Sequence, residues 1–150
     1  MDTILVTGGC GYIGSHTCIS LIENNFKVLI IDSLENSYQE IYFRIKEIVD
    51  QKGIDSNKMI NFIKGDLRNK KWLENIFQDY QKTNNPIKSV IHFAGLKSIE
   101  SSIEEPIKYW DTNISITLSL LYVMKKYECF NIIFSSSASV YKPNGKNKLK

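Results

Sequence analysis

The fold is decided by the stretch Ile4-Leu5-Val6-Thr7-Gly8-Gly9-Cys10-Gly11-Tyr12-Ile13-Gly14-Ser15-His16. A short apolar run ends in a cluster of glycines, which leads directly into a segment with helical spacing. This order predicts a strand, a phosphate-binding turn and a helix N-terminus, where backbone N–H groups and the helix dipole hold an anion. The motif reads G-x-G-x-x-G from Gly9 and G-x-x-G-x-x-G from Gly8, so the sequence leaves the role of the first glycine open between these two.

A second apolar run, Lys27–Ile31, ends in an acidic residue, Asp32. An acid at the end of the second strand is where the adenosine ribose of a dinucleotide is held. We expect Asp32 to be able to hydrogen-bond both ribose hydroxyls and to repel a 2′-phosphate, which favours NAD over NADP. The alternatives are an ordinary solvated acid in a turn and a strand-turn-helix unit without a ligand.

Short apolar runs alternate with amphipathic segments along the rest of the chain. The runs at 59–63, 89–93 and 130–134 predict further strands, and helical spacing begins near Ile41, near Trp72 and at Pro106. This alternation predicts an α/β fold with a doubly wound parallel sheet of about five strands, a Rossmann fold. The helical stripes that we expect are Ile13, Thr17 and Leu21 in the first helix and Trp110, Ile114, Leu118, Leu121 and Met124 in the last.

Composition narrows the class of protein. The net charge of +3 is modest and the lysines are scattered, which gives no support to nucleic-acid binding. No apolar run is long enough for a membrane span, and Met1 leads into the first strand without a signal peptide. The three cysteines have no framework spacing, which fits a reducing cytosol. We expect a cytoplasmic protein with no metal site.

The carboxyl ends of parallel strands meet at one edge of a sheet, where ligands bind. Asp66, the turn Phe93–Gly95 and the serines 135–137 all follow predicted strands. Asp66 either lies beside adenine or caps the next helix. His92 lies inside an apolar strand and is expected to be a buried, hydrogen-bonded histidine without a catalytic role.

Several motifs together resemble a known family. They are Thr7–Thr17, Asp32–Ser37, Gly65–Arg68, His92–Lys97 and Phe134–Tyr141. They resemble the N-terminal part of UDP-glucose 4-epimerases, which are extended short-chain dehydrogenases/reductases. The glycine turn is shared by the whole superfamily, whereas Phe93–Lys97 is a much narrower signature.

The resemblance implies a bound NAD and the interconversion of UDP-glucose and UDP-galactose through a 4-keto intermediate, a step of galactose metabolism. In the family a tyrosine base takes the proton of the sugar's 4-hydroxyl while hydride passes to the nicotinamide, and the full-length enzymes are expected to be homodimers. Ser137 matches the serine that hydrogen-bonds the reacting hydroxyl. The resemblance implies cofactor contacts at Gly8, Gly11, Tyr12, Ile13, Gly14, Asp32, Asn36, Ser37, Asp66, Leu67, Phe93, Ala94, Gly95 and Lys97.

The family continues past the serines to a Tyr-x-x-x-Lys pair on the next helix, which supplies the base. Here residues 142–150 form a short basic tail. We therefore expect an incomplete NAD-binding Rossmann domain over 1–141, a fragment that is inactive alone because it lacks this pair. Thr112 stands where some members have a cofactor-contacting asparagine, and Asn113 could take over part of that role.

Two alternatives remain at this point. The chain could be a stand-alone NAD-binding module with a regulatory or structural role. It could also belong to another extended nucleotide-sugar enzyme such as a dehydratase, which Leu96-Lys97 disfavours.

Overall fold

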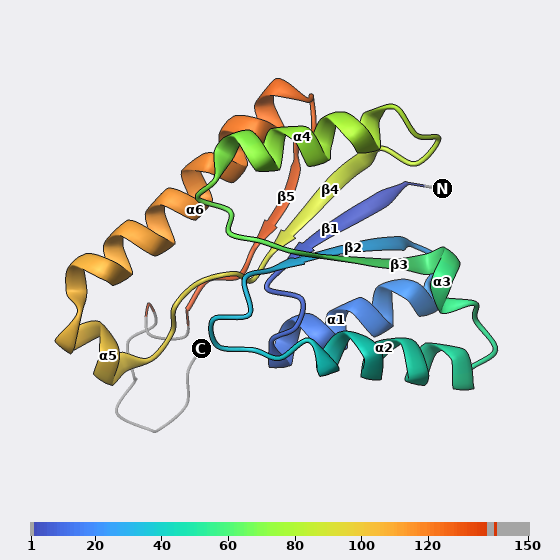
Figure 1. Cartoon of the computed structure of the whole chain (residues 1–150), viewed down its shortest axis with the longest axis horizontal. Helices are drawn as coiled ribbons and strands as arrows, with labels where there is room; N and C mark the ends of the chain where they lie inside the picture. Colours follow the sequence, from blue (N-terminus) through green and yellow to red (C-terminus); the bar gives the residue numbers. More distant parts are fainter. Residues whose placement is uncertain (1, 138–139, 141–150) are drawn as a thin grey trace.

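The computed structural model describes residues 2–137 and residue 140. Its strands form one parallel, five-stranded sheet in the order β3-β2-β1-β4-β5 (Figure 1). The strands are β1 (Thr3–Thr7), β2 (Lys27–Asp32), β3 (Ile60–Lys64), β4 (Ile87–His92) and β5 (Asn131–Phe134). The helices are α1 (Tyr12–Glu23), α2 (Glu40–Gln51), α3 (Ser56–Met59), α4 (Lys70–Gln81), α5 (Ile99–Glu104) and α6 (Pro106–Lys126).

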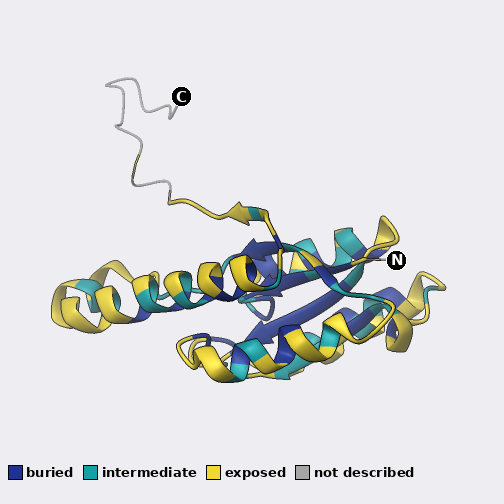
Figure 2. Cartoon of the chain, turned by 90° about the horizontal axis from the view of Figure 1, so that it is seen from above, coloured by how far each residue is buried: buried dark blue, intermediate teal, exposed yellow. Residues whose placement is uncertain are grey.

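Helices cover both faces of the sheet. One core, around Leu29, Leu73 and Leu120, lies between the sheet and the helices α4 and α6. A second, around Ile30, Ile22 and Val49, lies between the sheet and the helices α1 and α2. Figure 1 shows these helix pairs on opposite sides of the strands, and Figure 2 shows most of the strands buried and the exposed residues gathered on the helices and loops. The predicted doubly wound α/β fold is confirmed.

Strand register brings the carboxyl ends of the strands together. Thr7 at the end of β1 pairs with Ile31 of β2 and with His92 at the end of β4. His92 in turn pairs with Phe134, the last residue of β5. The loops that follow these strands therefore leave the sheet at one edge, where a site can form.

Two helices bury a different face from the one that the sequence predicts. The buried residues of α1 are Gly14, Cys18 and Ile22, not the stripe of Ile13, Thr17 and Leu21. Gly14 explains this rotation, because a side chain there would collide with the turn that precedes the helix.

The last long helix, α6, shows the same kind of error. Of its predicted stripe only Met124 is buried, whereas Trp110 is 70% exposed and Leu118 is 61% exposed. The residues of α6 that are buried are Thr112, Ile116, Leu120, Val123 and Met124.

The short helices α3 and α5 do not follow from apolar spacing. Each begins at a capping side chain: Asp55 accepts a hydrogen bond from the Asn57 amide, and Ser98 accepts one from the Ser101 amide. Pro106 occupies the first turn of α6, as predicted, where its missing N–H costs nothing.

Candidate functional site

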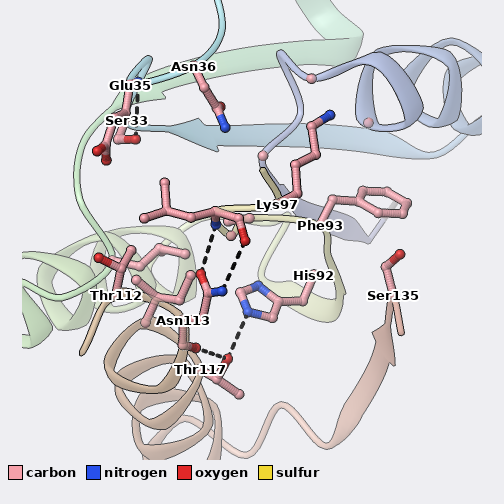
Figure 3. A pocket seen from close by; sticks show the side chains of 18 of the residues that line it. Ser33, Glu35, Asn36, His92, Phe93, Lys97, Thr112, Asn113, Thr117 and Ser135 are labelled. Atoms are coloured by element: carbon pink, nitrogen blue, oxygen red, sulfur yellow. Dashed lines mark hydrogen bonds between the residues drawn. The ribbon is translucent and has the colours of Figure 1, made fainter. Parts of the chain in front are cut away.

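A cavity of about 720 Å³ lies at the carboxyl ends of the strands. The glycine turn, the loops after β2, β3 and β4, the start of α6 and the serines after β5 line it (Figure 3). The sequence-predicted site residues that line it are Gly8, Gly11, Tyr12, Ile13, Gly14, Asp32, Asn36, Asp66, Leu67, Phe93, Ala94, Gly95, Lys97, Asn113 and Ser137. Ser37 is the exception: it is buried behind Asp32.

The glycine turn is built from close backbone contacts. Gly8 has φ 68°, and a Cβ there would lie 2.8 Å from the Ala94 amide nitrogen. A Cβ on Gly14 would lie 2.3 Å from the Gly8 carbonyl oxygen. Gly8 therefore requires both a left-handed backbone and a missing side chain, which assigns it the first glycine's role in the turn. Helix α1 starts directly after Gly11, and its first residues, Tyr12, Ile13 and Gly14, line the cavity. The first amides of a helix have no partner within the helix.

Asp32 ties the glycine turn to the loop after β2. Its Oδ2 accepts a hydrogen bond of 2.9 Å from the Cys10 amide, and its Oδ1 accepts from the Leu34 amide and the Ser37 hydroxyl at 3.0 and 2.9 Å. The Asp32 carboxylate thus accepts three hydrogen bonds from within the chain, and a carboxylate has acceptor capacity beyond these three. Burial, together with the nearby Asp32 charge, raises the pKa of the Cys10 thiol to about 12.

Asp66 faces the cavity and does not cap the helix that follows it. Asn69 caps α4 instead, with its side chain accepting from the Trp72 amide. Asp66 accepts hydrogen bonds from the backbone and guanidinium of Arg68, and these bonds hold the pKa of the Asp66 carboxyl below its usual value. Arg68 also lies 3.6 Å from Asp111 of α6, so this ion pair joins the loop after β3 to the far wall of the cavity.

The turn after β4 is clamped by a side chain of α6. Asn113 accepts a 2.8 Å hydrogen bond from the Leu96 amide through Oδ1 and donates one of 3.0 Å to the Leu96 carbonyl through Nδ2 (Figure 3). Its neighbour Thr112 also lines the cavity and is buried. Asn113 therefore shapes the wall of the cavity through Leu96.

His92 lies at the end of β4 with 2% of its surface exposed. Burial lowers the pKa of its imidazole to about 4, so the ring is neutral at neutral pH. Both ring nitrogens have hydroxyl partners, Thr7 and Thr117. The prediction of a buried, hydrogen-bonded histidine is confirmed.

Comparison with known families decides the relationship. Residues 5–148 match the protein-family model described as GDP-mannose 4,6 dehydratase. The chain belongs to this family.

Several similar curated proteins are named UDP-glucose 4-epimerases, which confirms the resemblance. The UDP-glucose 4-epimerase of Neisseria meningitidis serogroup A is 46% identical over 97% of this chain and 40% of its own length. The bifunctional UDP-glucose 4-epimerase and UDP-xylose 4-epimerase 1 of Pisum sativum is 45% identical over 92% of this chain and 37% of its own length. The chain thus spans about two fifths of the length of these relatives.

Solved structures of the family superpose well on the fold. The UDP-glucose 4-epimerase of Bifidobacterium longum, in complex with NAD+ and UDP, has a TM-score of 0.83 at 39% identity, over 97% of this chain and 40% of that one. The enzyme of Stenotrophomonas maltophila, with bound NAD and formylated UDP-arabinopyranose, has a TM-score of 0.83 at 36% identity, over 97% and 40%.

The spacing Tyr-x-x-x-Lys, which the resemblance implies for the catalytic base, occurs at two places in the described part of the chain. Tyr42 and Lys46 lie on α2 and Tyr122 and Lys126 on α6, and none of them lines the cavity. The ring of Tyr122 packs instead under the Lys70 ammonium, 4.0 Å away. Ser137 does line the cavity. The basic tail 142–150 and Tyr141 lie outside the described residues.

Several residues that line the cavity were not predicted from the sequence. The cavity is also lined by Arg68, by Thr117 and by two residues of α5, Ile99 and Ser102. Arg68 belongs to the motif Gly65–Arg68, a signal that could have found it. No pattern in the sequence marked the two residues of α5, because this short helix follows from the cap at Ser98 and not from apolar spacing.

In the part of the chain that the structure describes, no helix has both the length and the apolar character needed to cross a membrane.

Proposed function

We propose that this chain is the NAD-binding part of a UDP-glucose 4-epimerase, an enzyme that interconverts UDP-glucose and UDP-galactose. One observation carries the proposal: a single cavity contains an acidic strand end, a glycine turn at a helix N-terminus and a turn of small residues after β4. These features fit the ribose, the pyrophosphate and the nicotinamide half of a dinucleotide. The substrate is inferred from the relatives, which are named UDP-glucose 4-epimerases.

The strand order supports one direction for the bound dinucleotide. The glycine turn follows the central strand β1 and would bind the pyrophosphate through backbone amides. On the β2 and β3 side, Asp32 would accept from the adenosine ribose, and Asp66 and Leu67 would lie beside the adenine. The nicotinamide would then extend toward β4 and β5, against Phe93–Lys97 and near Ser137.

The charge of Asp32 supports NAD as the cofactor. A 2′-phosphate would have to approach a buried carboxylate that already accepts three hydrogen bonds. The one acceptor position left on Oδ2 suits a neutral hydroxyl. The solved relatives that contain NAD point in the same direction.

The proposed reaction would use both the cofactor and residues of this chain. When bound, NAD supplies a hydride acceptor at its nicotinamide. Ser137 would hydrogen-bond the 4-hydroxyl of the sugar and keep its proton directed at the base. The Asn113 clamp on Leu96 would hold the wall against which the nicotinamide lies. Since neither Tyr-x-x-x-Lys pair on α2 and α6 lines the cavity, we expect residues 1–150 alone to bind NAD without epimerising a sugar.

The activity is tested on a protein that contains this chain together with the remaining length of its relatives. Incubation with UDP-galactose should yield UDP-glucose, a product of unchanged mass. A product lighter by one water would establish the second candidate, a nucleotide-sugar dehydratase, which the description of the family model favours.

The third candidate, an NAD-binding module without catalysis, predicts NAD binding and no product from either class of reaction. Assays with several nucleotide-sugars, in the presence of NAD, therefore separate the candidates. Turnover of UDP-galactose by residues 1–150 alone would contradict our assignment of the base to the family's Tyr-x-x-x-Lys pair.

A further inference from the structure

His92 connects the central strands to the wall of the cleft. Its Nδ1 lies 2.6 Å from the Thr7 hydroxyl at the end of β1, and its Nε2 lies 3.2 Å from the Thr117 hydroxyl on α6. Figure 3 shows the ring between the β4 end and α6, with Thr117 below it. The family's reaction, as proposed above, makes no use of this imidazole.

The partners of the two threonines fix the direction of every hydrogen bond. Thr117 donates its only hydroxyl proton to the Asn113 carbonyl at 2.8 Å, so it accepts from the ring, and Nε2 carries the hydrogen. Nδ1 is then an acceptor, and Thr7 donates to it. The Thr7 hydroxyl oxygen in turn accepts from the Ala94 amide at 3.3 Å. This series of hydrogen bonds therefore runs without a break from the Ala94 amide to the Asn113 carbonyl, and every donor in it points in the same direction.

Both ends of this chain of hydrogen bonds hold the same turn. One end is the Ala94 amide, and the other is Asn113, whose side chain binds the amide and the carbonyl of Leu96. Ala94 also packs directly on Gly8, because a Cβ added to Gly8 would lie 2.8 Å from the Ala94 backbone nitrogen. A shift of the turn would thus change the β4 side of the cleft, while Asp32 holds the β2 side through separate contacts.

We propose that His92 is a positioning residue that, as the neutral Nε2–H tautomer, fixes the turn Ala94–Leu96 as the nicotinamide wall of the cleft. The inference rests on the proposed function for the direction in which NAD lies. It assigns His92 no contact with the reacting atoms: it acts through Thr7 on one side and through Thr117 and Asn113 on the other.

The test compares two ligands that share the adenosine half. NAD reaches both ends of the cleft, whereas ADP reaches only the adenosine and pyrophosphate end. In the 150-residue chain, Thr117→Val removes the acceptor of the Nε2–H bond at nearly constant volume. We expect affinity for NAD to fall about 3- to 10-fold, as for one lost hydrogen bond, and affinity for ADP to change less than about twofold.

Two further variants control this measurement. Thr117→Ser keeps the hydroxyl and is expected to restore most of the NAD affinity. Thr17→Val makes the same substitution on α1, at a threonine that also donates to the carbonyl four residues before it, and should change neither affinity. In parallel, ¹H–¹⁵N correlation spectra of the imidazole should show the proton on Nε2 of His92.

The outcomes separate the inference from the function on which it rests. If the folded wild-type chain binds no NAD, the proposed function fails and the inference fails with it. If the wild type binds NAD and Thr117→Val leaves that affinity unchanged, the inference alone is refuted. Equal losses for NAD and ADP would show a general structural role and also refute it, as would an Nδ1–H tautomer in the spectra.

Discussion

At the scale of single residues, one carboxylate joins two parts of the site. Asp32 accepts from the backbone of the glycine turn and from the loop after β2, so its carboxylate shapes the turn and also lies at the position that we propose for the ribose. Its remaining acceptor position is on Oδ2. Any change at Asp32 therefore alters the geometry of the turn together with the cofactor contact.

Asp32→Asn tests this double role. An amide keeps the size of the side chain, but its nitrogen cannot accept, so the Cys10 amide or the Leu34 amide loses its acceptor. Hydrogen bonds to a charged group contribute about 1.5–3 kcal/mol, so NAD affinity should fall about 10- to 100-fold, and the preference for NAD over NADP should shrink. Calorimetric titration measures both. Unchanged affinity and preference would make Asp32 an ordinary acid in a turn.

The positions of the site residues could be predicted from the sequence, but their partners could not. Asp32 and Asp66 follow apolar strands, and the ends of parallel strands share an edge, so their presence in one cavity follows from topology. That Arg68 pairs with Asp66, and that Asn69 caps α4 in its place, depends on the path of one short loop. Spacing in the sequence does not encode that path.

At the scale of elements, α4 depends on a defined start. The Asn69 side chain accepts from the Trp72 amide, which gives a partner to one of the first-turn amides that the helix itself leaves unpaired. The buried face of this helix, Leu73, Ile76 and Phe77, fills the core under α4 and α6. Loss of the cap should therefore lower the free energy of unfolding of the whole protein.

Asn69→Ala is expected to lower the free energy of unfolding by about 1 kcal/mol, the usual cost of losing a helix cap. Asn75→Ala is the matched control, since Asn75 is exposed in the middle of the same helix. There the higher helix propensity of alanine should raise stability by about 0.5 kcal/mol. Urea unfolding of the two variants should thus give shifts of opposite sign. Shifts of the same sign would show that Asn69 does not stabilise the protein as the cap of α4.

Helix faces were the part of the fold that apolar spacing predicted worst. In α6, the exposed stripe around Trp110 and Leu118 and the buried stripe around Ile116 and Leu120 are both apolar. A hydrophobic pattern of period 3.6 cannot choose between two such stripes. In α1 the choice is made by Gly14, whose contact with the Gly8 carbonyl is a tertiary feature.

At the scale of the whole molecule, the sheet order follows from general rules of chain topology. Short strand–helix repeats with right-handed crossovers produce a parallel sheet with helices on both faces, and the observed order β3-β2-β1-β4-β5 agrees. This order places β1 and β4 side by side at the centre, with the cleft at their carboxyl ends. The buried His92 sits at that junction, and we expect it to make global stability depend on pH.

Acid should weaken the fold through His92. Its pKa is about 4 when folded and about 6.5 when unfolded, so between these values the unfolded chain binds a proton that the folded chain does not. Stability should fall as pH drops through this window, by about 3 kcal/mol on reaching pH 4. His92→Gln cannot titrate there, so urea unfolding at pH 7 and near pH 4.5 should show a smaller loss for the variant. The same loss in both proteins would contradict the burial of a neutral imidazole.

The central claim is that the cleft holds NAD, with the adenosine ribose at Asp32. Calorimetric titration of the 150-residue chain with NAD and with NADP tests it most directly. We predict saturable binding of NAD and clearly weaker binding of NADP. Tighter binding of NADP, or no binding of NAD by a chain that circular dichroism shows to be folded, would contradict the account.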